Sequence, residues 1–457
     1  MERRYDLRMK ELMADAVVPP RAFQGMLSRL ARFVEPFAAR LGTSQQRRHT
    51  YEYVAGLLSN VSRKNVESVA YHHDQERRAL QKFIGECPWD HRPHLDILAR
   101  QVGRELGEPD GVIVFDPSGF PKKGTKSVGV KRQWCGRLGK VENCQVGVYM
   151  SYVSRKEHAL VNMRLYLPRE WTKDRSRCKA AGVPPETRFR TRHELALEML
   201  DEAGAVLPHG WVAGDDEMGR SSGFRRALRE RTERYLLAVP SNTLVRDLDA
   251  TPPEYTGRGR PPKTKFLRAE RWRAALPETA WTKIDVRDGE KGPLTIEAVS
   301  RRVQARTDRK GPGPEEVLFV TRERQSDGTY NHDYYLSNGD PATGVGEFAR
   351  AAKAAHRVEE GLKRGKSEAG LGDYEVRTWR GWHHHQTLSL LATWFLIQEA
   401  RREKNDNARH DRTPGPDGTG DDVATGAGLW PTSENRPERD ASIATQRKSP
   451  TLPLQTT

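Results

Sequence analysis

The chain has 457 residues, which is long enough for two or three domains with sizeable cores. Charged residues make up 30% of it and the net charge is +15, so we expect a polyanionic partner; nucleic acid is favoured over an acidic membrane surface because no amphipathic membrane-binding helix stands out. The charged amino terminus is unlike a signal peptide, and the apolar stretch at 390–397 is far shorter than the roughly 20 residues of a membrane span. We therefore expect a soluble cytoplasmic protein with no membrane partner, in which the four sparse cysteines are reduced thiols.

The first predicted domain, 1–107, is helical. Apolar residues recur at three- and four-residue steps, as at Leu30, Phe33, Val34 and Phe37, and strand signals are nearly absent. Arginines and lysines are scattered through this region. It is therefore expected either to bind DNA ends or to present an ordinary solvated helix face.

The second predicted domain, 108–242, mixes strands and helices. Its expected elements are three strands, a helix, a strand, a helix and a strand, at Val112–Phe115, Gln145–Tyr152, Met163–Leu167, Thr191–Ala203, Trp211–Ala213, Ser222–Arg234 and Tyr235–Val239. That order resembles the ribonuclease H-like fold. We therefore predict an α/β protein whose mixed sheet carries helices on both faces.

The remainder of the chain is predicted to hold an insertion, two helices and a tail. The insertion, 243–344, is rich in Pro, Gly and charge and contains β fragments. Helical periodicity returns in 345–403, which would complete the catalytic core. Residues 404–457 have few large apolar side chains and are expected to form a disordered tail.

Three acidic residues in this pattern suggest metal chemistry. Asp116 follows the apolar run Gly-Val-Ile-Val-Phe, Asp216 follows Gly-Trp-Val-Ala-Gly-Asp, and Glu359 lies in the last helical region. Carboxylates at strand ends can share a hard cation, and two Mg²⁺ ions, for which Mn²⁺ would substitute, suit attack on a phosphodiester. For any one aspartate the alternative is a turn or helix cap.

The choice within each acidic pair rests on geometry. Adjacent side chains on a strand point to opposite faces, so only one of Asp215 and Asp216 can face the site, and Asp216 is preferred because Glu-Met-Gly follows it. Glu359 is preferred over Glu360 because Lys366, seven residues on, shares its helix face. Lys366 is expected either to hold a phosphate or to be a simple exposed charge.

Four ordered segments resemble a known family. The segments are Phe-Asp-Pro-Ser-Gly-Phe-Pro-Lys-Lys-Gly, Gln-Trp-Cys-Gly-Arg-Leu-Gly-Lys-Val-Glu-Asn-Cys-Gln-Val-Gly-Val, Gly-Asp-Asp-Glu-Met-Gly and Glu-Ala-Gly-Leu-Gly-Asp-Tyr-Glu-Val-Arg-Thr-Trp. They resemble DDE transposases of bacterial insertion sequences, most closely the 701 family. The resemblance implies a nucleoid-associated enzyme that acts on double-stranded DNA at element ends and target, as at least a homodimer. It also implies catalysis by Asp116, Asp216 and Glu359. Ala352 and Ala355 stand where related transposases carry a tyrosine and an arginine.

Basic residues follow each proposed aspartate and are expected to neutralise phosphates. We predict DNA contacts from Lys122, Lys123, Lys131, Arg132, Arg220, Arg225 and Lys363. Arg258-Gly259-Arg260-Pro261 resembles the core of an AT-hook, whose arginines enter the minor groove; a basic Pro-rich linker is the alternative.

Other patterns and functions were weighed against these. A zinc site built from Cys135, Cys144 and nearby histidines is less expected than ordinary packed or surface cysteines. Three consecutive histidines, at 383–385, cannot easily share one ion on a helix, so core and surface positions are expected instead. The alternative functions are a ribonuclease H-like nuclease without strand transfer and a DNA-binding protein that has lost its chemistry.

Overall fold

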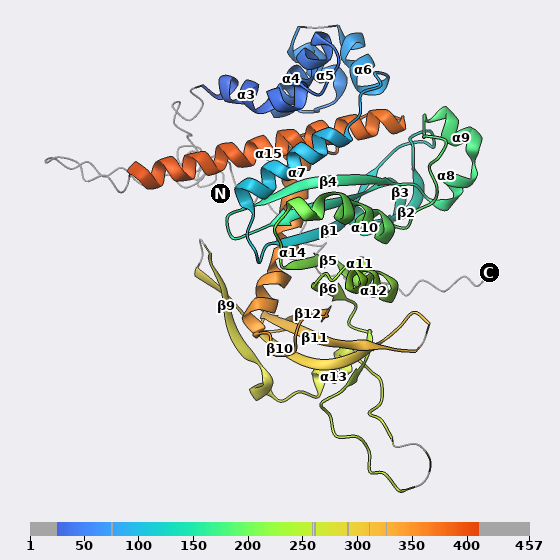
Figure 1. Ribbon diagram of the computed structural model, residues 1–457, viewed down its shortest axis with the longest axis vertical. Coiled ribbons are helices and arrows are strands. Elements are labelled where there is room, and N and C mark those ends of the chain that lie inside the picture. The colour runs from blue at the N-terminus through green and yellow to red at the C-terminus, as the bar shows by residue number, and fades with distance from the viewer. Residues whose placement is uncertain are drawn as a thin grey trace, which may run out of the picture.

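The structure is a computed structural model that describes residues 25–410 except 75, 258, 260, 261, 290, 291, 310 and 326. Within that part of the chain, no helix is long and apolar enough to cross a membrane. The element order agrees with the sequence-based prediction of helices, then a mixed αβ region, then a β-rich insertion, then two long helices (Figure 1).

The amino-terminal part consists of helices, as expected: α3 (Met26–Ala38), α4 (Ser44–Leu58), α5 (Val66–His72), α6 (Arg77–Gly85) and α7 (Arg92–Leu106). The start of α4 is fixed by a capping box, in which Thr43 and Gln46 satisfy each other's backbone N–H groups. The buried residues of α3 include Leu30, Phe33 and Phe37, at the spacing of one helix face.

These helices pack on the long final helix, α15 (Trp379–His410), rather than forming a separate body (Figure 1). Trp89 stacks on His384 with ring centroids 3.6 Å apart, and the Tyr53 hydroxyl lies 2.9 Å from Nδ1 of His385. The amino-terminal helices and the sheet therefore share one hydrophobic core.

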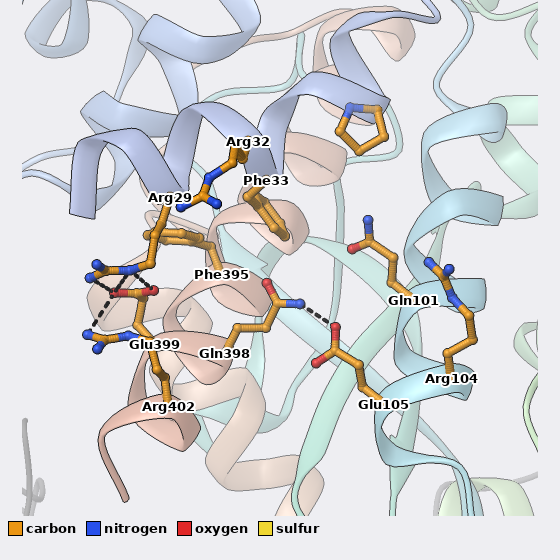
Figure 2. A pocket seen from close by; sticks show the side chains of 11 residues that line it. Arg29, Arg32, Phe33, Gln101, Arg104, Glu105, Phe395, Gln398, Glu399 and Arg402 are labelled. Atoms are coloured by element: carbon orange, nitrogen blue, oxygen red, sulfur yellow. Dashed lines mark hydrogen bonds and ion pairs between the residues drawn. The ribbon is translucent and has the colours of Figure 1, made fainter. Parts of the chain in front are cut away.

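A solvent-accessible cavity of about 430 Å³ remains where α3, α7 and α15 meet (Figure 2). Glu399 accepts hydrogen bonds from Nε of Arg29 at 2.7 and 3.0 Å, and Gln398 donates to Glu105 at 2.6 Å. These contacts tie α15 to its neighbours at the rim of the cavity.

The central sheet has the ribonuclease H-like order. Its strands are β1 (Val112–Pro121), β2 (Lys131–Cys135), β3 (Lys140–Val153), β4 (His158–Tyr166), β5 (Trp211–Gly214) and β6 (Tyr235–Val239). β1 pairs antiparallel with β3, β3 pairs antiparallel with β4, and β5 lies parallel to both β1 and β6. The short strand β2 was not among the predicted elements and forms a hairpin with β3.

Helices cover both faces of this sheet. On one face lie α14 (Val345–Glu368) and α15, which contact β1 and β3 through the side chains of Lys366 and Gln386. On the other face lie α10 (Arg192–Ala203) and α12 (Ser222–Glu230), where Phe224 contacts Phe115 edge to face. Short helices fill the connections: α8 (Arg169–Lys173), α9 (Arg175–Ala180) and α11 (Asp216–Arg220).

The insertion continues the same sheet. It contains β7 (Leu244–Asp247), β8 (Leu267–Arg268), α13 (Ala269–Ala274), β9 (Thr282–Gly289), β10 (Gly292–Arg306), β11 (Pro312–Arg324) and β12 (Tyr330–Ser337). β12 pairs antiparallel with β6, so the strand path runs β2-β3-β1-β5-β6-β12-β11-β10-β7-β8. The insertion also has a small hydrophobic core of its own, around Trp272 and Val303.

One boundary was set wrongly from the sequence. The tail was expected to begin at 404, but α15 continues to His410. Residues 411–457 lie outside the described part of the chain.

Candidate active site

Asp116 lies inside strand β1 and not at its end. β1 continues to Pro121 because β3 keeps pairing with it, with Asp116 opposite Tyr149. The parallel pairing with β5 nevertheless stops one residue earlier, at Phe115 opposite Gly214. The prediction that β1 ends at Asp116 was therefore wrong where β1 pairs with β3. Where β1 pairs with β5, Asp116 is the first residue after the last pair.

Asp215 occupies the matching position on β5. It directly follows Gly214, the last residue of that strand, and its carboxylate caps α11 by accepting a hydrogen bond from the Met218 N–H at 3.1 Å. Helix α11 packs closely against β6 at Gly219. Any other residue there would place its Cβ atom 1.9 Å from the carbonyl oxygen of Ala238. This close packing fixes the turn that carries Asp215 beside Asp116.

The charges of these two aspartates interact. The pKa of Asp215 is raised well above its ordinary value, first by desolvation within the surrounding protein and next by the carboxylate of Asp116. The surface of Asp215 is still open to solvent. Two neighbouring carboxylates that repel each other at a position open to solvent form a donor set that fits a divalent cation.

Asp216 is placed differently. It is the first residue of α11, its side chain is 45% exposed, and it forms an ion pair with Arg220, one turn on, at 3.3 Å. The alternation of side chains along a strand, on which the preference for Asp216 rested, does not apply because β5 has already ended at Gly214. The carboxylate that the structure brings to Asp116 is that of Asp215.

Lys366 approaches Asp116 from helix α14. Its Nζ atom lies 2.7 Å from the hydroxyl of Ser118 and 5.2 Å from the centre of the Phe120 ring. Burial lowers the pKa of this lysine, and the charge of Asp116 opposes that change. Ser118 is two residues beyond Asp116 on β1. Because side chains along a strand alternate between the two faces, Ser118 shares the face of Asp116 and is a further site residue.

Glu359 stands on α14 two helical turns before Lys366 and is exposed to solvent. Its neighbour Glu360 forms an ion pair with Arg364 at 2.6 Å. Ala352 is buried and Ala355 is packed against the core. In the described residues no group of three or more Asp, Glu, His or Cys side chains is arranged to hold a metal ion.

Comparison with known proteins identifies the family. Residues 36–293, more than half of the chain, match the DDE superfamily endonuclease family. The chain belongs to the DDE endonuclease superfamily. It is also similar to a protein of Microchaete diplosiphon described as "Probable transposase for insertion sequence element IS701", with 24% identity over 324 residues, which cover 70% of this chain and 74% of that protein. The family match includes Asp116 and Asp215 and ends before α14.

DDE superfamily endonucleases act on DNA and generally use divalent metal ions. Several predicted DNA contacts in this family member are exposed: Lys123, Lys131, Arg132, Arg220 and Lys363. Lys131 forms an ion pair with Glu170, so only part of its charge faces solvent. Arg258 and Arg260, the arginines of the AT-hook pattern, lie outside the described residues.

Two of the residues predicted to contact DNA bind other groups of the endonuclease instead. Lys122 donates to the Tyr374 carbonyl at 2.8 Å and lies 3.4 Å from the centre of that ring; burial lowers its pKa to about 8. Arg225 is buried and pairs with the buried Glu316 at 2.9 Å. The prediction that Arg225 belongs to a basic surface was wrong, because its partner comes from β11 in the insertion, which sequence spacing does not reveal.

The other polar patterns of the sequence are structural in this endonuclease. His383, His384 and His385 are all buried, and their ring nitrogens contact carbonyl or hydroxyl oxygens. Cys135 and Cys144 are buried beside Val146. The sequence left core and surface positions open for both sets, and both sets lie in the core.

Proposed function

We propose that this DDE endonuclease is an insertion-sequence transposase. In this proposal it binds the terminal inverted repeats of its element, hydrolyses the phosphodiester backbone and joins the freed 3′ ends to target DNA at the nucleoid. The observation that carries the proposal is that Asp116 and Asp215 directly follow the last parallel pair of β1 and β5 and that their charges interact, with Lys366 near Asp116. The named similarity to a probable transposase supports the same function.

The carboxylates of Asp116 and Asp215 would hold the metal, with Glu359 as the third acidic residue from α14. We assign Asp215 rather than Asp216 to the site because the charge of Asp116 helps to raise the pKa of Asp215. Oxygen donors favour Mg²⁺, with Mn²⁺ as a substitute, and two ions suit a phosphodiester reaction. When bound, the ions activate water or a 3′ hydroxyl and stabilise the leaving oxygen.

Lys366 would position the scissile phosphate. Its ammonium group donates to Ser118, which fixes the long side chain on the Asp116 face of β1. An ammonium held there offers further N–H donors to a non-bridging phosphate oxygen and neutralises charge beside the carboxylates. Pairing of two element ends requires at least two copies of the chain, so we propose a homodimer in the assembled complex.

The test uses the full-length protein and DNA from both flanks of its coding sequence, containing any terminal inverted repeats. With Mg²⁺ the parent protein should cut at the repeat ends and give joined products with a target plasmid. Asp116→Asn, Asp215→Asn and Glu359→Gln should bind the ends and fail to cut, while the matched controls Asp216→Asn and Glu360→Gln should still cut. Cutting without joining would favour the nuclease alternative, and cutting by the Asp116 variant at the parent rate would refute the site.

A further inference from the structure

The β2–β3 hairpin carries an unusual amount of exposed apolar surface. Trp134, Leu138 and Val141 are 47%, 40% and 50% exposed. Eight large hydrophobic side chains are exposed in the described part of the chain, and three of them are on this hairpin. The Trp134 indole forms no hydrogen bond, ring contact or cation contact with other described residues. Exposed apolar surface concentrated in this way marks an interaction site.

Strand register places Trp134 on the same side of the β ribbon as Asp116. Trp134 lies opposite Val141 on β3, and Asp116 lies opposite Tyr149 on the same strand. Val141 and Tyr149 are separated by an even number of residues, so their side chains point to the same face. The hairpin curls back beside β1, because a Cβ atom at Gly119 would lie 3.4 Å from Cα of Cys135. Trp134 therefore stands within roughly 20 Å of Asp116, which is the length of about six base pairs.

Positive charge accompanies the apolar residues. Arg132 precedes Trp134 by two residues and shares its face, and Arg137 lies in the short turn between the strands. Neither arginine forms an ion pair within the described structure. The charge of Arg137 helps to lower the pKa of Lys366, so the tip of the hairpin lies near the proposed phosphate-binding lysine. The basic surface is thus continuous with the site.

We propose that this hairpin face binds the DNA that flanks the cut, with Trp134 stacking on an unpaired base and Arg132 and Arg137 contacting the adjacent phosphates. An exposed indole flanked by guanidinium groups without ion-pair partners suits the binding of single-stranded nucleic acid. Every base offers a π face to the indole, and every nucleotide offers a phosphate charge to the guanidinium groups. A second copy of this chain fits less well, since two such surfaces would bring like charges together. The position of the stacked base relative to the cut rests on the proposed function; the stacking itself does not.

The test measures binding without cleavage, using full-length Asp116→Asn protein in metal-free buffer. End DNA carries 2-aminopurine at one position within about six nucleotides of the cut, in fully paired and locally unpaired versions. We expect tighter binding to an unpaired version and quenching of the probe. Trp134→Ala should weaken that binding roughly 10- to 100-fold, the range for loss of one stacked base.

Five further variants separate the explanations. Trp134→Phe should restore much of the binding because it keeps an aromatic face, while Trp134→Leu should not, because it keeps only apolar area. Tyr71→Ala, which removes another exposed aromatic ring, from α5, is the control and should bind like the parent. Arg132→Gln and Arg137→Gln should each reduce the slope of log affinity against log salt concentration by about 0.7–0.9.

Three results would overturn the proposal: equal binding by the Trp134→Leu and parent proteins, no preference for unpaired DNA, or loss of a dimer in sedimentation of the Trp134→Ala protein without DNA. Failure of the proposed function would look different. Cutting by the Asp116→Asn protein would refute the catalytic assignment while leaving the quenching at Trp134 intact.

Discussion

The ammonium group of Lys366 donates a hydrogen bond to the hydroxyl of Ser118 at 2.7 Å, across the interface between α14 and β1. This contact joins a helix that begins after the insertion to a strand more than two hundred residues earlier in the chain. It holds the ammonium group on the strand face that carries Asp116, where we propose that it meets the scissile phosphate.

Removal of this cation should slow cleavage more than it weakens binding. We expect Lys366→Ala to lower the single-turnover cleavage rate about 100-fold or more, the usual cost of losing one charge-stabilising donor. Ser118→Ala, which removes only the group that orients the lysine, should have a smaller effect. Ser367→Ala changes an exposed residue on the same helix and is the control. A Lys366→Ala protein that cuts at the parent rate would exclude a role for the lysine in the reaction.

The two aspartates should destabilise the metal-free protein at neutral pH. The pKa of Asp215 is raised in the folded state, so this residue favours folding while protonated and loses that contribution as pH rises through the folded-state pKa. Asp215→Asn should therefore raise the thermal midpoint at pH 7 without metal, and should abolish the further rise that Mg²⁺ gives the parent. Differential scanning fluorimetry with and without Mg²⁺ measures both effects. A lower midpoint for Asp215→Asn than for the parent would contradict the repulsion.

Acid should loosen the attachment of the amino-terminal helices to α15. In its neutral form His385 can donate from Nε2 to the Gly370 carbonyl at 2.9 Å while Nδ1 accepts from the Tyr53 hydroxyl at 2.9 Å. Burial lowers the pKa of His385 to about 4, so its stabilising contribution is complete above the ordinary value of 6.5 and is lost as pH falls toward 4.

Between pH 7.5 and 5.0 this one histidine should cost about 2 kcal/mol of unfolding free energy. Urea unfolding at a series of pH values measures the slope, which His385→Gln should reduce by about one proton. The exposed His356 provides the control, as His356→Gln. If the His385→Gln protein keeps the parent slope, the histidine is not the group that titrates.

The buried pair Arg225–Glu316 should contribute to stability and not to DNA affinity. Nε of Arg225 donates to Glu316 at 2.9 Å, and the Tyr235 hydroxyl donates to the same oxygen at 2.6 Å. Arg225→Ala leaves a buried carboxylate without its cation and should cost about 3–5 kcal/mol of unfolding free energy. Arg225→Met with Glu316→Leu should recover most of that loss, because both charges are gone.

Equilibrium unfolding compares these variants with Arg220→Ala, a change at an exposed arginine that should stay within about 0.5 kcal/mol. DNA affinity of the folded double variant should match the parent. A marked loss of affinity there would return Arg225 to the DNA-binding set.

Local patterns were sufficient to predict most of the elements. The apolar run before Asp116, the helical periodicity from 345 onward and the alternating β fragments of the insertion depend on neighbouring residues, and the corresponding elements are β1, α14 and β10–β12. The shared face of Glu359 and Lys366 follows from helix geometry in the same way.

Features that depend on distant partners were not predictable. The choice between Asp215 and Asp216 requires the register of β5 against β1, and β5 ends one residue before Asp215. The burial of Arg225 requires Glu316, which lies 91 residues away in sequence. Likewise, nothing in the local pattern of Lys122 indicates that its ammonium group stacks on Tyr374.

The pairing of β12 with β6 has a practical consequence for dissecting the protein. Removal of 243–344 would strip β6 of its outer neighbour and leave Leu236 and Leu237 on an open sheet edge with unpaired backbone groups. Open, flat, apolar edges recruit other strands. A chain shortened in this way should self-associate through β6, so the contribution of the insertion to DNA binding is better measured by surface substitutions than by deletion.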